Sequence, residues 1–284
     1  MIEQILAPWH AVVSALPFEW ARFGFMRLAL LAVLLVSPLL GAFGTVVVAN
    51  RMAFFSEAIG HAAFTGIALG VILGLSDPLV SMLGFALLLT LAITWFRRRG
   101  GLSSDTAIGL VMAFTVSLGI VILSRGGDFA RYTNFLIGDM LAITAKDIAW
   151  LALLALAVGA LFFFFFNRLL LAALSPAIAR SRAKHAAAAE LVFACLLAVV
   201  VTCALPWIGI LVINALLILP AAAARNLARD SAQFFGWSVA ISLVAGITGL
   251  FASFYASTAT GATIVLAAMA VYLLTLLRRA SSAG

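Results

Sequence analysis

Residues 51–75 read RMAFFSEAIGHAAFTGIALGVILGL. From Glu57 to Leu75 the stretch is almost entirely apolar and close to the length of about 20 residues that a helix needs to cross a membrane. It also carries two ionisable side chains, Glu57 and His61, four residues apart. The stretch therefore predicts a transmembrane helix with a polar pair on its surface.

Glu57 and His61 fall on one face of that helix, because positions i and i+4 are one turn apart. An oxygen donor and a nitrogen donor can thus reach the same point beside the helix. Ionisable groups are costly to bury in a membrane, and a transition-metal ion would offset the cost of burying both. We interpret the pair as a candidate metal site. The alternative is a structural pair, hydrogen-bonded inside a helix bundle.

The composition is that of a polytopic membrane protein. Of the 284 residues 65% are hydrophobic and 10% are charged, against roughly 25% charged in ordinary soluble domains. Runs such as residues 161–166, LFFFFF, lack the alternating polar residues of a membrane β-barrel. We predict an all-α transmembrane bundle of nine spans, with eight as the alternative: Arg27 to Val48, Glu57 to Leu75, Pro78 to Phe96, Thr106 to Leu123, Ile148 to Phe166, Ala187 to Leu205, Ile208 to Ala223, Phe235 to Tyr255 and Ala262 to Leu277.

Basic residues indicate the orientation, because Lys and Arg collect on the cytoplasmic side of membrane proteins. Nine spans with a cytoplasmic C-terminus place twelve of the seventeen Lys and Arg residues inside: Arg51, Arg97, Arg98, Arg99, Arg168, Arg180, Arg182, Lys184, Arg225, Arg229, Arg278 and Arg279. Topology therefore accounts for the net charge of +7, and nucleic-acid binding is not expected.

The N-terminal residues 1–22 differ from the predicted spans. Pro8, Pro17, Glu3 and Glu19 lie there among Trp and Leu residues, which suits an interfacial amphipathic helix better than a span. No small-residue cleavage site of a signal peptide is visible. We expect residues 23–284 to form a single transmembrane domain.

Two other regions carry polar residues of interest. In the predicted cytoplasmic loop 167–186, Ser175 suits an N-cap and Pro176 suits the first turn of a short helix that a soluble partner could bind, with a solvated basic loop as the alternative. Asn214 interrupts a predicted span, in which Pro220 also removes a backbone hydrogen bond. Asn214 is expected either to line a path or to bond across helices.

Several motifs, in order, carry a family resemblance. They are RMAFFSEAIGHA at residue 51, SPAIAR at residue 175, WIGILVINALLILPAAAARNLA at residue 207 and TATGATIVLAA at residue 258. From about Leu39 to Leu277 the chain resembles the membrane permease subunit of the ABC-3 family, which imports zinc, manganese or iron. The resemblance implies the fold of a type II ABC importer permease.

The resemblance also implies roles for particular residues. Glu57 and His61 match the carboxylate and histidine that the family uses to contact metal. The segment 175–182 matches the coupling helix that docks into the ATPase, which gives ATPase-coupling roles to Ser175, Pro176, Ile178, Arg180 and Arg182. The chain departs from the family at three places: Glu57 replaces the usual Asp, Asn214 replaces a common Thr, and Ser175 and Ala177 replace acidic residues.

The predicted function follows from the resemblance and from what the chain lacks. Its lysines, Lys146 and Lys184, each follow Ala, so it has no Gly-Lys-Ser/Thr of a Walker A loop. We therefore predict a non-enzymatic, multi-pass permease of the bacterial inner membrane, in an ATP-driven importer of divalent Zn, Mn or Fe ions. A cytoplasmic ATPase, an extracytoplasmic metal-binding protein and a second permease copy are its expected partners. No permanently bound cofactor is expected.

Two other functions are weighed against this one. A permease for a siderophore or cobalamin usually has a longer chain and about ten spans, and would leave Glu57 and His61 without an obvious role. An ion-coupled secondary transporter could use Glu57 as a proton carrier, but an inverted internal repeat that would favour it is not visible.

Overall fold

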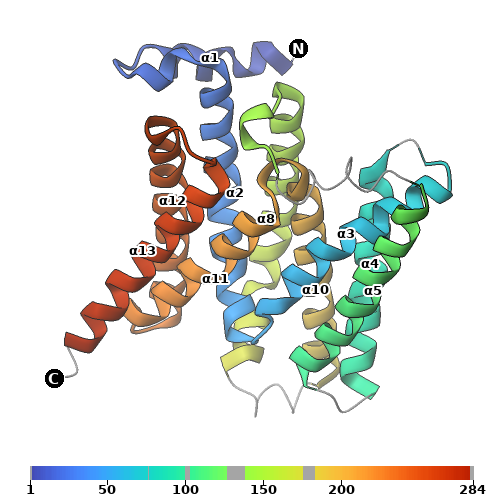
Figure 1. The fold of residues 1–284 in the computed structure, drawn as a ribbon. Helices are drawn as coiled ribbons and strands as arrows, with labels where there is room; N and C mark the ends of the chain where they lie inside the picture. Colours follow the sequence, from blue (N-terminus) through green and yellow to red (C-terminus); the bar gives the residue numbers. More distant parts are fainter. Residues whose placement is uncertain (1, 76, 100–102, 127–137, 175–182, 282–284) are drawn as a thin grey trace. The chain divides into compact units, whose positions relative to one another are not determined.

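The computed structural model describes residues 2–75, 77–99, 103–126, 138–174 and 183–281. Helices are the regular elements of this part of the chain (Figure 1): α1 Ile2–Ser14, η1 Glu19–Arg22, α2 Gly24–Ala49, α3 Ala53–Ile72, α4 Pro78–Arg99, α5 Ser104–Gly126, η2 Met140–Ala142, α8 Ala145–Leu174, α10 Ala183–Ile208, α11 Ile210–Leu227, α12 Ser231–Ala256 and α13 Thr260–Ser281. Within these residues, nine helices are long and apolar enough to cross a membrane. The predicted helical fold and the predicted count are confirmed.

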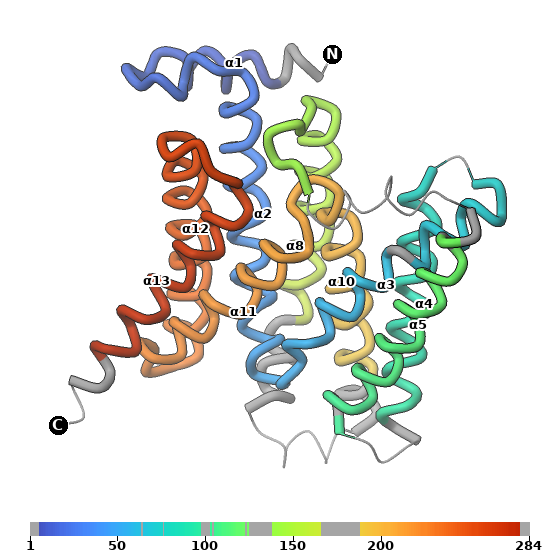
Figure 2. The backbone as a smooth tube through the Cα atoms, viewed as in Figure 1, coloured from blue at the N-terminus to red at the C-terminus, as the bar shows by residue number. Residues whose placement is uncertain are grey.

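The chain forms two compact units, the first of which comprises Met1–Thr45, Gly138–Ala157 and Trp207–Gly284. In this unit α11, α12 and α13 lie side by side and contact one another (Figure 2). Serines tie α12 to α2 as well: Ser238 Oγ donates to the carbonyl of Gly41 at 2.6 Å, and Ser242 Oγ donates to that of Ser37 at 2.7 Å. These bonds satisfy buried hydroxyls and fix the register of the two helices.

The second unit comprises Val46–Ile137 and Val158–Pro206. Here α3 packs extensively against both α4 and α5, whereas α4 and α5 contact each other much less. An ion pair joins α4 to α10, with Arg97 Nη1 2.7 Å from Glu190 Oε1. The helix α3 is therefore the central element of the α3–α4–α5 group.

A tight turn, Asn50–Met52, joins α2 to α3. Arg51 has a φ of 55°, a left-handed conformation that is uncommon for a residue with a side chain. Hydrogen bonds to the end of α2 hold the turn: among them, Asn50 Nδ2 donates to the carbonyl of Val46 at 3.0 Å, and the Met52 amide donates to that of Val47 at 2.9 Å. Met52 is buried, so the start of α3 is fixed by this turn.

The junction between α10 and α11 is a single glycine, Gly209, with a φ of 78°. Gly138 approaches it so closely that a Cβ on Gly138 would lie 2.2 Å from the Gly209 amide nitrogen. A side chain on Gly138 would collide with this backbone, and the positive φ of Gly209 also favours glycine. The end of α10 differs from the predicted one. The predicted span ended at Leu205, whereas α10 continues to Ile208. It passes through Pro206, although proline usually disrupts a helix.

Candidate metal site

Glu57 and His61 lie one turn apart on α3, as their spacing predicts. Glu57 Oε1 is 3.9 Å from His61 Nε2, which is too long for a hydrogen bond. The two side chains point to the same side of the helix without being bonded to each other. A direct hydrogen bond between Glu57 and His61 is therefore not part of this geometry.

The pair lies on an accessible strip of an otherwise buried helix segment. The His61 and Glu57 side chains are 32% and 39% exposed. Their neighbours Ala58, Ile59 and Ala62 are at most 1% exposed. The helix is thus accessible on the face that carries the two donors, and an ion arriving there would meet both.

One flank of α3 packs on α4 through glycines. A Cβ on Gly66 would lie 2.7 Å from Met82 Cα, and one on Gly70 would lie 2.3 Å from Ser81 Oγ. This is the close approach that a ridge of small residues permits between membrane helices. Gly74 does not continue this ridge, because α3 ends at Ile72 and a Cβ on Gly74, whose φ is 67°, would meet nothing within 4 Å.

The other flank of α3 packs on α5. Thr65, one turn beyond His61, donates a buried hydrogen bond to the carbonyl of Thr115. A Cβ on Gly119 would lie 2.5 Å from Thr65 Oγ1 and 2.9 Å from the Thr65 amide nitrogen. Sequence analysis missed these three residues, because nothing in the pattern shows that α5 is the neighbour of α3.

A single chain offers two ligands at this position. The described residues contain no group of three or more His, Cys, Asp or Glu side chains that could hold a metal ion. Zinc commonly takes four ligands, so the Glu57 and His61 pair is half of such a set. The two cysteines, Cys195 and Cys203, are unpaired residues of α10.

Asn214 lies in α11, within the first unit, whereas Glu57 and His61 lie in the second. Its Oδ1 atom is buried and accepts no hydrogen bond from the described residues. An unpaired polar atom in a buried position is costly, so Asn214 Oδ1 has an unused capacity to accept a donor. The predicted coupling residues, Ser175 to Arg182, lie outside the described residues.

Comparisons with known proteins show the family of the chain. The model of the ABC 3 transport family matches residues 22–279, nearly the whole chain. The chain belongs to the ABC 3 transport family. This result confirms the resemblance found in the sequence motifs.

Relatives in this family cover most of the chain. It is 29% identical over 252 residues to the high-affinity zinc uptake system membrane protein ZnuB of Haemophilus influenzae, covering 88% of this chain and 96% of that protein. It is also 29% identical to the manganese import system permease protein ScaB of Streptococcus gordonii, covering 88% and 90%. Among solved structures it is similar to PsaBC from Streptococcus pneumoniae in complex with Fab, with a TM-score of 0.78, 27% identity and 95% of each chain covered.

Proposed function

We propose that this chain is the membrane permease subunit of an ATP-driven importer of divalent transition-metal ions: Zn, Mn or Fe. The observation that carries the proposal is the pair of Glu57 and His61, which are not bonded to each other and lie on an accessible strip of α3. The pair lies in a chain of the ABC 3 transport family, whose relatives include zinc and manganese permeases. Localisation in the bacterial inner membrane follows from this family and from the nine apolar helices of the described residues.

The donor chemistry of the pair fits this cargo. A carboxylate and an imidazole suit Zn(II), Mn(II) and Fe(II), whereas Cu(I) prefers thiolate or thioether ligands. With Oε1 and Nε2 3.9 Å apart, both atoms can turn toward one ion. Two donors bind an ion less tightly than a closed set of four, which suits a transient binding site on a translocation path.

A second copy of the chain would complete the ligand set. Two permeases related by a two-fold axis would bring two Glu57 and two His61 side chains together, and four donors match the tetrahedral preference of zinc. Isologous pairing of this kind is the commonest arrangement of homo-oligomers. In this arrangement the pairs face the axis, and the ion passes between the two chains.

Two further partners belong to the proposal. A separate cytoplasmic ATPase supplies the energy, because this chain has no Walker A loop. It would dock on the segment 175–182 through Ser175, Pro176, Ile178, Arg180 and Arg182. An extracytoplasmic metal-binding protein would deliver the ion on the other side of the membrane.

Asn214 is a candidate residue of the translocation path. Its Oδ1 atom is buried without a hydrogen-bond donor among the described residues, so a hydrated ion or a path water could provide one. The unpaired Oδ1 supports this interpretation over a bond across helices that Oδ1 would accept, because no such bond is formed within the described residues.

We also infer that residues 1–22 lie at the membrane interface, beside a transmembrane domain formed by residues 23–284. α1 is anchored to α2 where Trp9 Nε1 donates to the Arg27 carbonyl at 3.0 Å, and Arg27 Nη1 donates to that of His10 at 3.3 Å. Apolar side chains such as Val12 and Phe18, 69% and 51% exposed, remain available for contact with lipid.

Uptake by the reconstituted complex tests the proposed function. The chain, its ATPase and its binding protein would be reconstituted in vesicles, and uptake of radioactive zinc, manganese and iron would be measured with and without ATP. ATP-dependent uptake of at least one free ion is expected. Uptake of a siderophore or cobalamin in place of every free ion would overturn the proposal.

A further inference from the structure

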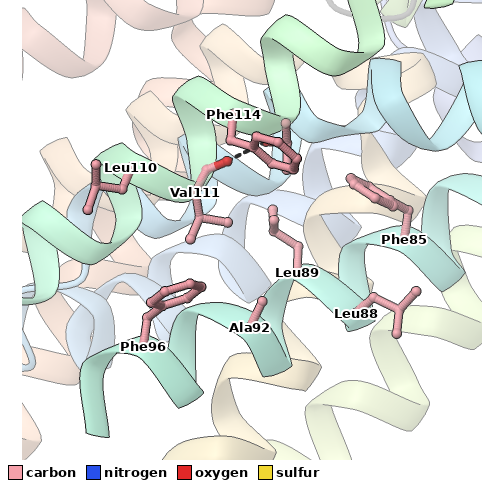
Figure 3. Close-up of a pocket in the computed structure, with 9 residues that line it drawn as sticks. Phe85, Leu88, Leu89, Ala92, Phe96, Leu110, Val111 and Phe114 are labelled. Carbon is pink, nitrogen blue, oxygen red and sulfur yellow. Dashed lines mark hydrogen bonds between the residues drawn. The ribbon is translucent and has the colours of Figure 1, made fainter. Parts of the chain in front are cut away.

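An apolar groove runs between α4 and α5. It exists because both helices pack on α3 and contact each other little. Its volume is about 450 Å³, which lies within the range of about 300–1,000 Å³ typical of small-molecule sites. Figure 3 shows Phe96 toward one end of the groove and Phe85 toward the other, along the same side of α4.

The groove has exposed walls and a buried floor. Leu88 on α4 is 64% exposed and Phe114 on α5 is 68% exposed, whereas Leu89 at the floor is 3% exposed. Thr115 is the polar residue of the lining, and its hydroxyl already donates to the Val111 carbonyl at 2.8 Å. The groove therefore offers no free polar partner to a polar ligand, and it suits a hydrocarbon chain.

The dimensions of the groove match one leaflet of a bilayer. From Phe85 to Phe96 the helix rises about 16 Å, roughly half of the hydrocarbon core of about 30 Å. The spans formed by α4 and α5 are among the least covered, with 28% of each span buried, against 72% and 71% for α2 and α3. In a membrane this face meets acyl chains unless another protein covers it.

The end of α4 that follows Phe96 is basic in sequence. Arg97, Arg98 and Arg99 follow Phe96 directly and form the last residues of α4. Glu190 pairs with Arg97, and Asp105 lies in the first turn of α5. Three arginines against these two acids leave a positive excess, which attracts the anionic headgroups of a bilayer.

We propose that the groove binds one acyl chain of an anionic phospholipid, whose headgroup lies at the Arg97–Arg99 end of α4. The apolar lining, the length of one leaflet and the charge at that end all fit this single ligand. This site is separate from Glu57 and His61, and its occupancy does not depend on transport. A second copy of this chain is the competing occupant.

Native mass spectrometry of the full-length protein tests the proposal. The protein would be equilibrated with an equal mixture of phosphatidylglycerol and phosphatidylcholine in mild detergent, and the lipid retained per chain would be counted. We expect phosphatidylglycerol to be retained in excess. Equal retention of the two lipids would overturn the proposal.

Groove variants localise the lipid. Ala92→Phe fills the groove and should lower the retained phosphatidylglycerol roughly tenfold, since lost contact with two methylene groups already has about that effect. Ala113→Phe is the matched control, because Ala113 is exposed on α5 and does not line the groove. Phe114→Ala removes an exposed wall without creating a buried cavity and should also lower retention. Wild-type retention in both groove variants would overturn the proposal.

Charge variants and the mass of the complex distinguish a bound lipid from a second copy of the chain in the groove. Arg98→Gln combined with Arg99→Gln should lower the preference for phosphatidylglycerol over phosphatidylcholine roughly tenfold. If Ala92→Phe instead reduces the number of chains per complex while retained lipid is unchanged, the groove is an interface between copies and the lipid proposal is wrong.

Discussion

The hydroxyl of Thr65 in α3 donates a buried hydrogen bond to the backbone carbonyl of Thr115 in α5. Since Thr65 lies one turn beyond His61, this bond sets the position of the helix that carries the candidate ligands. Gly119, one turn along α5 from Thr115, lies against the Thr65 backbone and allows the helices to approach.

Gly119→Ala should therefore separate α3 from α5. Its new Cβ would lie 2.5 Å from Thr65 Oγ1, and overpacking of this kind typically costs about 1 to 3 kcal/mol. We expect a lower melting temperature and slower metal uptake. Thr65→Val should have a smaller effect, because hydrogen bonds between membrane helices average about 0.6 kcal/mol.

Gly109→Ala is the control for that series. Gly109 also lies in α5, but a Cβ there meets nothing within 4 Å, so the variant should melt at or slightly above the wild-type temperature. Equal effects of the Gly109 and Gly119 substitutions would show that the close approach of α5 to α3 does not determine stability or uptake.

Replacement of either candidate ligand should abolish transport. We expect Glu57→Gln and His61→Ala to reduce uptake to the background level while the protein still inserts in the membrane, because each removes one of two donors from the site. Ser56→Ala is the control, since its buried hydroxyl donates to Ala53 within α3 at 3.3 Å. Wild-type uptake rates in both ligand variants would remove Glu57 and His61 from the mechanism.

Transport should fall as the pH is lowered. Metal binds a deprotonated carboxylate and a neutral imidazole, so protons compete with the ion for both groups. Uptake and zinc affinity of the reconstituted complex, measured from neutral to mildly acidic pH, should decline together. Uptake that is constant or rises toward acid pH would favour a proton-carrier role for Glu57.

Coupling to the ATPase should depend most on Ile178. Burial of an isoleucine side chain is worth roughly 1.5 to 3 kcal/mol, whereas an exposed ion pair contributes about 0 to 1 kcal/mol. Ile178→Asp should weaken co-purification with the ATPase and uncouple ATP hydrolysis from transport. Arg180→Ala or Arg182→Ala should have a milder effect that depends on salt. An Ile178→Asp protein that associates and transports normally would place the contact elsewhere.

The sequence predicts what depends on local pattern. Apolar runs gave the nine spans, and the spacing of Glu57 and His61 gave their shared face on α3. The sequence did not reveal the hydrogen bond between Thr65 and Thr115, the ion pair of Arg97 and Glu190, or the groove between α4 and α5. These features depend on which helices are neighbours. The end of α10 was also misplaced, since the predicted span ended at Leu205 and the helix continues through Pro206 to Ile208.

The short turn Asn50–Met52 has a consequence for the synthesis of the protein. Among the candidate spans of the described residues α3 has the lowest mean hydropathy, whereas α2 is strongly apolar. A helix with Glu and His enters a bilayer poorly by itself. Because the turn joins the two helices so directly, we expect the translocon to release α2 and α3 into the membrane together. Lengthening the turn would then reduce the amount of protein inserted in the membrane, independently of any effect on the activity of the inserted protein.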